Sequence, residues 1–317
     1  MIYLTDADVI ALDIDLELVR QVVGSAFAAY GNGELLTSPK SSIPVGLGHA
    51  FQVLSAVDKS SGYAAVKWIG MVPPGGAAAV NINATIILSD VATGLTLGIM
   101  DARHATGLRT AAMSAQAVQI LARENCSVLG LVGAGTQAQS HLLAIKRVLP
   151  KLGRVLISSR TAASAERLAE LCRGLGVDAE VGSTEEVVKA SDVIVSTVPT
   201  TPDFKPIIDP AWVKSGGLAI SVEVGRAWMH AGLADMDLTI VDEEKLKYYA
   251  QPGNLVPNLE HAQATLTDLI CRRHPGRTSD DQRIMFVTSG SAVADLAIAS
   301  LVYEQARERG SGKVIVA

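Results

Sequence analysis

The residues with the clearest chemical meaning belong to a glycine turn in mid-chain. The turn follows the apolar run 128–132 and opens a helical stretch, and its residues are Gly133, Gly135, Thr136, Gln137 and Ala138. In a strand–turn–helix unit of this kind, the first glycine permits a tight turn and the second lets the backbone approach a pyrophosphate on the helix N-terminus. Ala138 stands in the place of the third glycine. The pattern therefore predicts a dinucleotide phosphate site.

The end of the next strand, 154–158, indicates which dinucleotide is bound. An enzyme that uses NAD carries an acid here to accept a hydrogen bond from the ribose 2′-hydroxyl group, but this chain has Ser159, Arg160 and Thr161. Arg160 offers a guanidinium fork to a 2′-phosphate, and no carboxylate repels that phosphate. We therefore predict NADPH as the cofactor, with NADH possible. In the alternative, the glycines form only a tight turn, Arg160 is a solvated surface charge, and the protein shows no preference for NADPH.

Other predicted cofactor contacts lie near helix starts and at the carboxyl ends of later strands, where open parallel sheets bind their ligands. They are Ser164, Thr197, Val198, Pro199, Ser221, Val222 and Gly290. Three aromatic residues, Trp228, Tyr248 and Tyr249, could shape a substrate pocket or fill a dimer surface.

Two basic residues in the first half of the chain are candidates for anion binding. Lys67 lies inside the apolar strand 63–69, where an ammonium group must either reach solvent or have a function. Arg109 lies near the start of the alanine-rich helix 106–123, and a helix N-terminus with an adjacent guanidinium attracts an anion. In the alternative, Lys67 extends from a sheet edge into solvent and Arg109 pairs with a surface acid.

Two patterns of elements hold these residues. Before residue 124, a helix at 15–30 precedes short strands that predict an antiparallel or mixed sheet, at 50–56, 63–69, 83–88 and 95–101. From residue 124, strands and helices alternate as in a doubly wound sheet. The strands are 128–132, 154–158, 179–181, 193–197, 218–222 and 239–241, with helices at 162–175 and 184–190.

A last helix, 292–307, has no obvious partner in the nucleotide fold, and we expect it to return to the first domain. The predicted fold class is α/β, with a Rossmann-type doubly wound parallel sheet domain and a smaller α+β domain for substrate binding and dimerisation. We assign residues 1–123 with 287–317 to the substrate domain and residues 124–286 to the NADP-binding domain.

Composition excludes several classes of function. The 317 residues are 49% hydrophobic and 19% charged, as in a globular protein, and the length favours two domains. A net charge of -5 without runs of Lys or Arg disfavours nucleic acid as a partner. The sequence shows no secretory signal and no apolar run of bilayer length. The cysteines Cys126, Cys172 and Cys271 are scattered, so we predict buried thiols in a cytoplasmic protein with no metal and no membrane partner.

Four segments together resemble the ornithine cyclodeaminase/mu-crystallin family: 109–114 (Arg-Thr-Ala-Ala-Met-Ser), 133–138, 159–161 and 289–296. The resemblance covers nearly the whole chain in the correct order. It implies a two-domain subunit whose substrate domain uses both chain ends, and a homodimer built through the sheet of that domain.

The same resemblance implies how a small-molecule substrate is held. In the family, three basic residues bind the substrate carboxylate, and the matching positions are Lys40, Lys67 and Arg109. Lys40 replaces the usual arginine and so loses the bidentate fork of a guanidinium group. The arginine of the Arg-Thr-Ala-Ala segment also lies near the cofactor phosphates in the family, so Arg109 could serve both ligands.

A departure from the family decides the predicted reaction. Cyclodeaminases carry an aspartate in a glycine-containing loop after the strand that here is 218–222, where it activates the amine and water chemistry of ammonia loss. Gly225 aligns best with that aspartate and cannot act as a base, while Arg226 resembles an arginine of ketimine reductases. Glu223, two residues away, could replace the missing carboxylate if the loop is shifted.

The resulting prediction is an NADPH-dependent oxidoreductase that reduces a C=N bond. The substrate is a small cyclic imine carboxylate of the Δ1-pyrroline-2-carboxylate or Δ1-piperideine-2-carboxylate type, and the product is a cyclic amino acid. Lys67 and Arg109 are the predicted catalytic residues, because they orient the carboxylate against the nicotinamide. The proton comes from a protonated imine, from water or from Lys67.

Three alternatives stay open. The chain could be an amino-acid dehydrogenase or reductive aminase that acts on a 2-oxo acid. It could be an ornithine cyclodeaminase. It could also be a non-catalytic protein that binds NADPH or a small ligand.

Overall fold

The computed structural model describes residues 1–73, 82–199, 204–244 and 259–315. The chain divides into two compact units, Met1–Met113 with Ser291–Ala317 and Ser114–Gly290. In the sequence, the second unit is thus a continuous insertion into the first. The first division falls inside helix α3 (Arg103–Leu121), whereas we predicted a boundary after this helix, between residues 123 and 124. The two positions differ because α3 is an unbroken helix whose two halves belong to different units.

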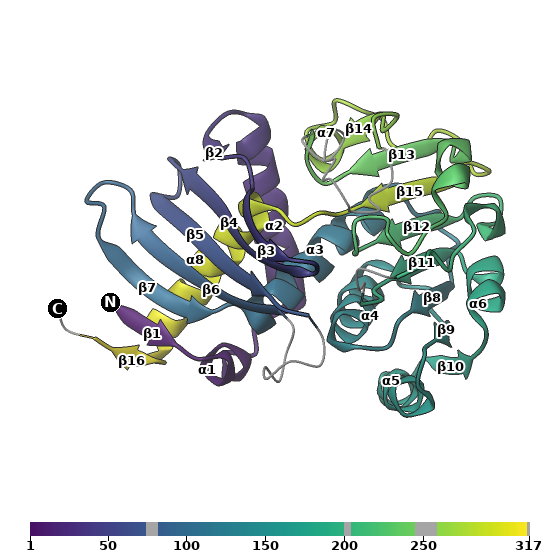
Figure 1. The fold of residues 1–317 in the computed structure, drawn as a ribbon, viewed down its shortest axis with the longest axis horizontal. Helices are drawn as coiled ribbons and strands as arrows, with labels where there is room; N and C mark the ends of the chain where they lie inside the picture. Colours follow the sequence, from purple (N-terminus) through teal and green to yellow (C-terminus); the bar gives the residue numbers. More distant parts are fainter. Residues whose placement is uncertain (74–81, 200–203, 245–258, 316–317) are drawn as a thin grey trace. The chain divides into compact units, whose positions relative to one another are not determined.

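The first unit is built around a mixed sheet (Figure 1). The strand order is β16-β1-β7-β6-β5-β4-β2, with β3 paired to β4. Strand β1 runs parallel to β7, and the other pairs are antiparallel. The strands are β1 (Ile2–Leu4), β2 (Leu35–Thr37), β3 (Ser41–Gly46), β4 (His49–Asp58), β5 (Tyr63–Met71), β6 (Ile82–Asp90), β7 (Thr96–Asp101) and β16 (Lys313–Val314). The sequence indicated β4 to β7 but not the other four, whose runs are short or, in β3, interrupted by Pro44.

Helices pack on this sheet. They are α1 (Asp6–Ala11), α2 (Leu16–Gly31) and α8 (Ala292–Arg309). The first part of α3 also belongs to this unit. Helix α8 packs across β4, β5 and β6 and against α2. Its N-terminus is fixed by Ser291, whose Oγ accepts hydrogen bonds from the N–H groups of Val293 and Ala294. The C-terminal helix is therefore part of the first unit.

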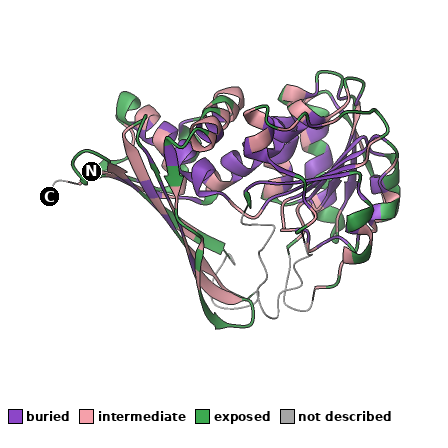
Figure 2. Ribbon diagram, turned by 90° about the horizontal axis from the view of Figure 1, so that it is seen from above, coloured by how far each residue is buried: buried purple, intermediate pink, exposed green. Residues whose placement is uncertain are grey.

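The strands of the mixed sheet include partly buried and exposed stretches, pink and green in Figure 2. The side chains that turn away from α8 include several apolar ones. Along β5 and β6, Lys67 and Ile86 are buried, whereas their neighbours Trp68 and Ile87 are 45% and 37% exposed. The Trp68 ring stacks on Phe51 with the centroids 5.4 Å apart. We call this surface the outer sheet face and define it by Phe51, Val53, Val57, Val66, Trp68 and Ile87.

The second unit is a parallel sheet with the strand order β10-β9-β8-β11-β12-β15-β13-β14 (Figure 1). Its strands are β8 (Val128–Val132), β9 (Arg154–Ser158), β10 (Asp178–Val181), β11 (Val193–Ser196), β12 (Leu218–Ser221), β13 (Leu238–Val241), β14 (Ala264–Thr265) and β15 (Ile284–Val287). Its helices are α4 (Thr136–Val148), α5 (Ala162–Gly174), α6 (Thr184–Ala190) and α7 (Leu266–Ile270), with short 3-10 turns η1 (Pro210–Trp212) and η2 (His230–Asp235). This confirms the predicted α/β fold with a doubly wound parallel sheet.

The sequence did not indicate β15, which lies between β12 and β13 in the sheet. The strand consists of four residues, all buried, after a polar loop. The periodicity of such a short apolar run does not distinguish a buried strand from a buried helix segment. Because β15 intervenes, β12 and β13, which follow one another in the sequence, are not paired.

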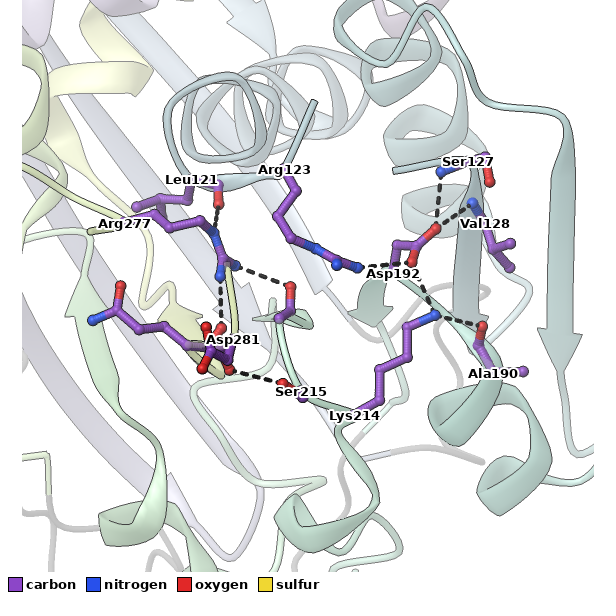
Figure 3. Close-up of polar contacts among 12 residues, drawn as sticks. Leu121, Arg123, Ser127, Val128, Ala190, Asp192, Lys214, Ser215, Arg277 and Asp281 are labelled. Atoms are coloured by element: carbon purple, nitrogen blue, oxygen red, sulfur yellow. Dashed lines mark hydrogen bonds and ion pairs between the residues drawn. The ribbon is translucent and has the colours of Figure 1, made fainter. Parts of the chain in front are cut away.

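A charged network closes the amino ends of the central strands (Figure 3). Asp192, just before β11, accepts hydrogen bonds from the N–H groups of Ser127 and Val128 and pairs with Arg123 at 3.2 Å and Lys214 at 2.9 Å. Burial alone would raise the pKa of Asp192, but these hydrogen bonds hold it below its ordinary value. The Asp192 carboxylate thus receives two backbone hydrogen bonds and two cations from the protein itself, so this edge of the sheet serves the fold.

Candidate active site

The glycine turn after β8 has the geometry that the motif requires. Gly133 has a φ of 104°, and a Cβ atom there would lie 2.7 Å from Thr197 Oγ1. Its N–H donates to the carbonyl of Ser158 at 2.8 Å, which ties β8 to β9. A side chain at this position would therefore strain the backbone and collide with β11's end.

The start of α4 is open to a ligand. Gly135 is the N-cap residue and makes no side-chain cap, and no heavy atom of the described structure lies within 4 Å of a Cβ built there. The first N–H groups of a helix lack intrahelical partners and attract anions. Ala138 is fully buried, as the close packing of helix and strand requires. These features fit a pyrophosphate at the turn.

The carboxyl edge of the sheet contains buried polar atoms that lack a partner. The chain moves from β8 to β9 and β10 in one direction and to β11 and β12 in the other, which makes the β8–β11 gap the switch point where such sheets bind ligands. Within the described ranges, Gln137 Oε1, Thr197 Oγ1 and Glu223 Oε2 are buried without a hydrogen-bonding partner. They follow β8, β11 and β12 respectively. Since buried polar atoms are normally satisfied, these atoms fit a polar ligand such as a dinucleotide.

The predicted 2′-phosphate region lies at the end of β9 and the start of α5. Thr161 is the N-cap of α5 and makes no side-chain cap, and its Oγ1 donates to Ser164 Oγ at 2.9 Å. Arg160 is exposed. Arg167, which we did not identify from the sequence, donates to Ser164 Oγ at 3.0 Å. The sequence could have indicated Arg167, because it lies one helical turn after Ser164 and so brings a second guanidinium group to the start of α5.

The remaining predicted cofactor residues of the second unit lie along the same edge. Ser221 is buried at the end of β12, and the N–H of Val222 donates to the carbonyl of Ser196 at 3.1 Å. Thr136 and Ser159 begin the two segments described above, with Val198 partly buried and Pro199 exposed after β11. Gly290 has a φ of 93°, and its N–H donates to Asp242 Oδ2 at 3.0 Å. Their contacts to a cofactor stay predictions.

In the first unit, a buried cluster joins three ionisable side chains. Lys67 Nζ lies 2.6 Å from Asp295 Oδ1, and Arg109 Nε lies 2.9 Å from the same oxygen. The three side chains are 1%, 7% and 3% exposed for Lys67, Arg109 and Asp295. The alternative in which Lys67 leaves a sheet edge for solvent is wrong, because β5 is paired on both sides and α8 covers this face. Arg109 likewise pairs with a buried acid, not with a surface acid.

The cluster is not saturated by its own members. The Arg109 Nε–Asp295 contact is close but not aligned as a hydrogen bond, so the buried Arg109 Nε–H donates to no described residue. Two cations face a single carboxylate, which leaves an excess of positive charge. The arrangement can therefore accept one further anion.

Burial lowers the pKa of Lys67 to about 8. The Asp295 carboxylate acts in the opposite direction, while the positive charges of Arg109 and Lys40 lower the pKa further. Lys40, partly buried just before β3, thus acts electrostatically on Lys67. The structure brings together all three basic residues that the sequence singled out, although their roles stay predictions.

Asp295 is the residue of this cluster that sequence reasoning missed as a functional group. It belongs to the segment 289–296 on which the resemblance rests, and it lies in the first turn of α8, where a carboxylate interacts favourably with the helix dipole. The sequence could have indicated this role, because an acid among the apolar residues of a predicted buried helix needs a partner.

The loop after β12 holds Glu223 in place of the expected aspartate. Glu223 Oε1 accepts hydrogen bonds from Ser196 Oγ at 2.7 Å and Ser221 Oγ at 2.8 Å. Burial raises the pKa of Glu223 to about 7, although these hydrogen bonds act to lower it. Gly225, with a φ of 77°, donates its N–H to Ser221 Oγ at 2.8 Å. The loop thus carries a carboxyl group, but two residues before Gly225.

Three other expectations concern side chains outside these clusters. Trp228 fills the core of the second unit with 0% exposure and donates to Ser196 Oγ at 2.9 Å, so it does not belong to a surface. Tyr248 and Tyr249 lie outside the described residues. Cys126 and Cys172 are buried free thiols, as predicted, whereas Cys271, the C-cap residue of α7, is a free thiol that is only partly buried.

The described residues contain neither a membrane-spanning helix nor a metal-binding cluster. No helix there is long and apolar enough to cross a membrane. No three His, Cys, Asp or Glu side chains in the described ranges gather to hold a metal ion.

The fold and the glycine turn together define the class of this protein as a two-unit α/β protein with a dinucleotide-binding unit. Within that class, the chain belongs to the ornithine cyclodeaminase/mu-crystallin family, whose family model matches residues 3–310.

Four proteins illustrate the range of similar chains. The chain is 30% identical to an alanine dehydrogenase of Archaeoglobus fulgidus over 98% of its length and 97% of that protein. It is 29% identical to a Δ1-pyrroline-2-carboxylate reductase of Bacillus cereus, over 74% of each chain. Among solved structures, an archaeal alanine dehydrogenase dimer with bound NAD has a TM-score of 0.89 and 29% identity, over 100% of this chain and 99% of that one. The Thermococcus litoralis Δ1-pyrroline-2-carboxylate reductase, solved with NADH and L-proline, has a TM-score of 0.90 at 24% identity, over 99% and 100%, which shows the shared fold.

Proposed function

We propose that this protein is an NAD(P)H-dependent reductase of a small cyclic imine carboxylate, of the Δ1-pyrroline-2-carboxylate or Δ1-piperideine-2-carboxylate type. The product is the corresponding cyclic amino acid. The observation that carries the proposal is the buried cluster of Lys67, Arg109 and Asp295. Its two positive charges exceed its one negative charge, which favours the binding of one carboxylate. The family relationship and the relatives that act on C=N bonds support it.

The residues of the cluster contribute to the reaction mainly by orientation. Lys67 and Arg109 bind the carboxylate, which fixes the position of the imine carbon bonded to it. Buried side chains that already pair with Asp295 lose little freedom when the substrate binds, so the bound geometry is preorganised. The nicotinamide cofactor supplies the hydride. Reduction also consumes one proton at the nitrogen.

A second candidate is an alanine-type amino-acid dehydrogenase that acts on a 2-oxo acid and ammonia. The full-length likeness to an alanine dehydrogenase favours it. Both candidates deliver a hydride to a C=N carbon beside a carboxylate, so the same cluster serves either. Ornithine cyclodeamination is less favoured, because Gly225 stands at the aspartate position and Glu223 Oε1 accepts from two serine hydroxyls.

A spectrophotometric assay separates these candidates. We expect loss of NADPH absorbance with Δ1-pyrroline-2-carboxylate or Δ1-piperideine-2-carboxylate from pH 6 to pH 7.5, and little with pyruvate and ammonia. Turnover restricted to pyruvate with ammonia would favour the dehydrogenase. Ammonia release from L-ornithine would indicate a cyclodeaminase. Cofactor binding without turnover of any of these compounds would indicate a binding protein.

We also propose a preference for NADPH over NADH, carried by Arg160 with support from Arg167 and the hydroxyls of Thr161 and Ser164. The variant Arg160→Ala is expected to raise the Kd for NADPH about 10- to 100-fold, since hydrogen bonds to charged groups contribute about 1.5–3 kcal/mol. The Kd for NADH should change little, because NADH lacks the 2′-phosphate. Fluorescence titration of both cofactors measures the two constants, and equal losses for both would contradict the assignment.

We further propose that two copies of the chain form a homodimer through the outer sheet face. Partly exposed apolar side chains gather on this face, with Ser55 and Thr85 among them, and a gathering of exposed apolar side chains marks an interaction surface. A solved relative is a dimer. Trp68→Glu should convert the dimer to a monomer in light scattering, because it places a charge in the patch. Val181→Glu changes an equally exposed apolar residue on β10 and serves as the control that should stay dimeric. A wild-type chain that is monomeric would refute this assembly.

The reducing cytoplasm is the compartment we propose for this enzyme. All three cysteines are free thiols. Free thiols persist where glutathione and thioredoxin keep cysteines reduced, and NADPH-dependent chemistry is supplied there.

A further inference from the structure

The buried carboxyl group of Glu223 takes no part in the binding of the substrate carboxylate. It lies in the second unit after β12, at the carboxyl edge of the sheet. One oxygen, Oε1, is held by Ser196 from β11 and Ser221 from β12. The other, Oε2, is buried and meets no aligned hydrogen-bond donor in the part of the chain that the structure describes, although the backbone N–H groups of Glu223 and Ala227 act to lower the pKa of the carboxyl group. A buried oxygen left in this state is costly unless a ligand or a proton satisfies it.

The backbone around Glu223 is strained to hold it there. Val224 has a φ of 63°, and Gly225 follows with a φ of 77°. A β-branched residue in the left-handed region is a genuine outlier, which costs about 1–3 kcal/mol and is typical of ligand sites. Trp228 and Gly225 complete the support by donating hydrogen bonds to Ser196 and Ser221. The loop is therefore built to keep the Glu223 carboxyl group in one orientation.

The position of Glu223 along the sheet indicates which part of a dinucleotide it meets. The pyrophosphate site lies at the glycine turn after β8, and the predicted 2′-phosphate region lies after β9, on one side of the switch point. A dinucleotide extends from the pyrophosphate in both directions. The nicotinamide half must then extend over the ends of β11 and β12, where Ser196, Ser221 and Glu223 lie.

We propose that Glu223 is a proton-linked partner of the nicotinamide: its carboxyl group is protonated beside the neutral reduced ring and ionises beside the cationic oxidised ring. The inference rests on the proposed use of a nicotinamide cofactor. The charge on the oxidised ring stabilises a nearby carboxylate, since an opposite charge within about 4–6 Å lowers the pKa of a carboxyl group by about 1–3 units. Among the described contacts, the groups that hold Oε1 are uncharged.

The proton balance matches the reaction proposed above. Reduction of a C=N bond adds a hydride to carbon and a proton to nitrogen, while NADPH becomes NADP⁺. Glu223 loses one proton as the ring gains its positive charge, so the proton that leaves Glu223 balances the proton that the nitrogen gains. Glu223 regains a proton from water when NADP⁺ dissociates. Burial places the pKa of Glu223 at about 7, so this exchange is available at neutral pH.

Other ionisable residues on neighbouring segments must be separated from Glu223 in any test. They are Arg226 in the same loop, His230 in η2, and Asp242 after β13. All three remain in the variant Glu223→Gln, so a pH effect that disappears in this variant belongs to Glu223. The exposed acid Glu185 on α6 offers the matched control Glu185→Gln.

The experiment is the measurement of Kd for NADP⁺ and NADPH from pH 5.5 to pH 8 by calorimetry, without substrate. Both forms carry the same 2′-phosphate, so its titration cancels in the ratio Kd(NADP⁺)/Kd(NADPH). In the wild type and in Glu185→Gln, this ratio should fall about tenfold or more as the pH rises, the change that one pKa unit produces. In Glu223→Gln it should change less than about twofold. Calorimetry in two buffers should show proton release on NADP⁺ binding to the wild type.

A second variant keeps the test decisive if Glu223→Gln does not fold. Ser221→Ala removes a hydrogen bond that lowers the pKa of Glu223, so the pH at which the ratio levels off should rise. A flat ratio in the wild type, or the same slope in Glu223→Gln, would overturn this inference even if the protein reduces imines. A wild type that binds neither cofactor would overturn the proposed function as well.

Discussion

Replacement of Lys67 by Met is expected to reduce kcat/KM for the cyclic imine carboxylate about 100-fold or more, since truncation of one partner of a buried charge pair costs about 2–5 kcal/mol. Methionine preserves the length and the apolar contacts of the stem but removes the ammonium group. The loss should fall on the carboxylate and leave cofactor binding intact, because Lys67 and the glycine turn belong to different units. Lys59→Met, at an exposed position after β4, is the matched control and should behave as the wild type.

The same residue sets a pH dependence of substrate binding. The pKa of Lys67 is about 8, so its charge is present below pH 8 and is lost as the pH rises through that value. Pyrrole-2-carboxylate is a suitable probe, because it is a planar carboxylate without an imine nitrogen. Its Ki in the wild type should rise above pH 8, whereas in Lys67→Met it should be high and nearly flat. A wild-type Ki that is independent of pH from 6 to 9.5 would contradict the role given to Lys67.

The second large effect is expected on stability, from Asp295→Asn. The change preserves the shape of the side chain but leaves Lys67 and Arg109 buried without their shared counter-charge. The free energy of unfolding should fall by about 3–5 kcal/mol, the cost of breaking a buried ion pair from one side. Urea denaturation measures this loss, with Glu308→Gln, an exposed acid on the same helix, as the control.

The loss in Asp295→Asn should depend on pH in a defined direction. Without Asp295, the pKa of Lys67 in the folded state falls further below the value of 10.5 that an unperturbed lysine has. The unfolded chain then binds more protons than the folded chain between those two values, so stability rises with pH in that window. The difference between Asp295→Asn and the wild type should therefore be smaller at pH 9 than at pH 6. An equal loss at both values would indicate that the defect is in packing and not in charge.

Much of the second unit was predictable from the sequence, because the residues that define each of its elements lie close together along the chain. The run 128–132, Gly133 and the helix start at Thr136 lie within a few residues of one another, and each imposes its own geometry. The same holds for the basic end of β9. By contrast, β15 lies between β12 and β13 in the sheet, although both strands precede it in the sequence. Its four residues contain no information on which strands they pair with.

The two clusters of the candidate site differ in the same way. Lys67 stood out because an ammonium in an apolar strand violates a local rule. Its partner Asp295 is 228 residues away in the sequence. An acid in the first turn of a helix is common, so nothing in the sequence indicated that Asp295 also pairs with Lys67. Glu223 was noticed as a substitute carboxylate, but the hydroxyls that hold it come from two strands whose register only the folded sheet defines.

The order of the units along the chain has a consequence for synthesis on the ribosome. The second unit is one uninterrupted stretch and can fold as soon as it emerges, whereas the first unit must wait for its final helix, α8. Until then, Lys67 has no counter-charge and the helix-facing side of the mixed sheet lacks its cover. A nascent chain would therefore complete the parallel-sheet unit before Lys67 and Arg109 could pair with Asp295.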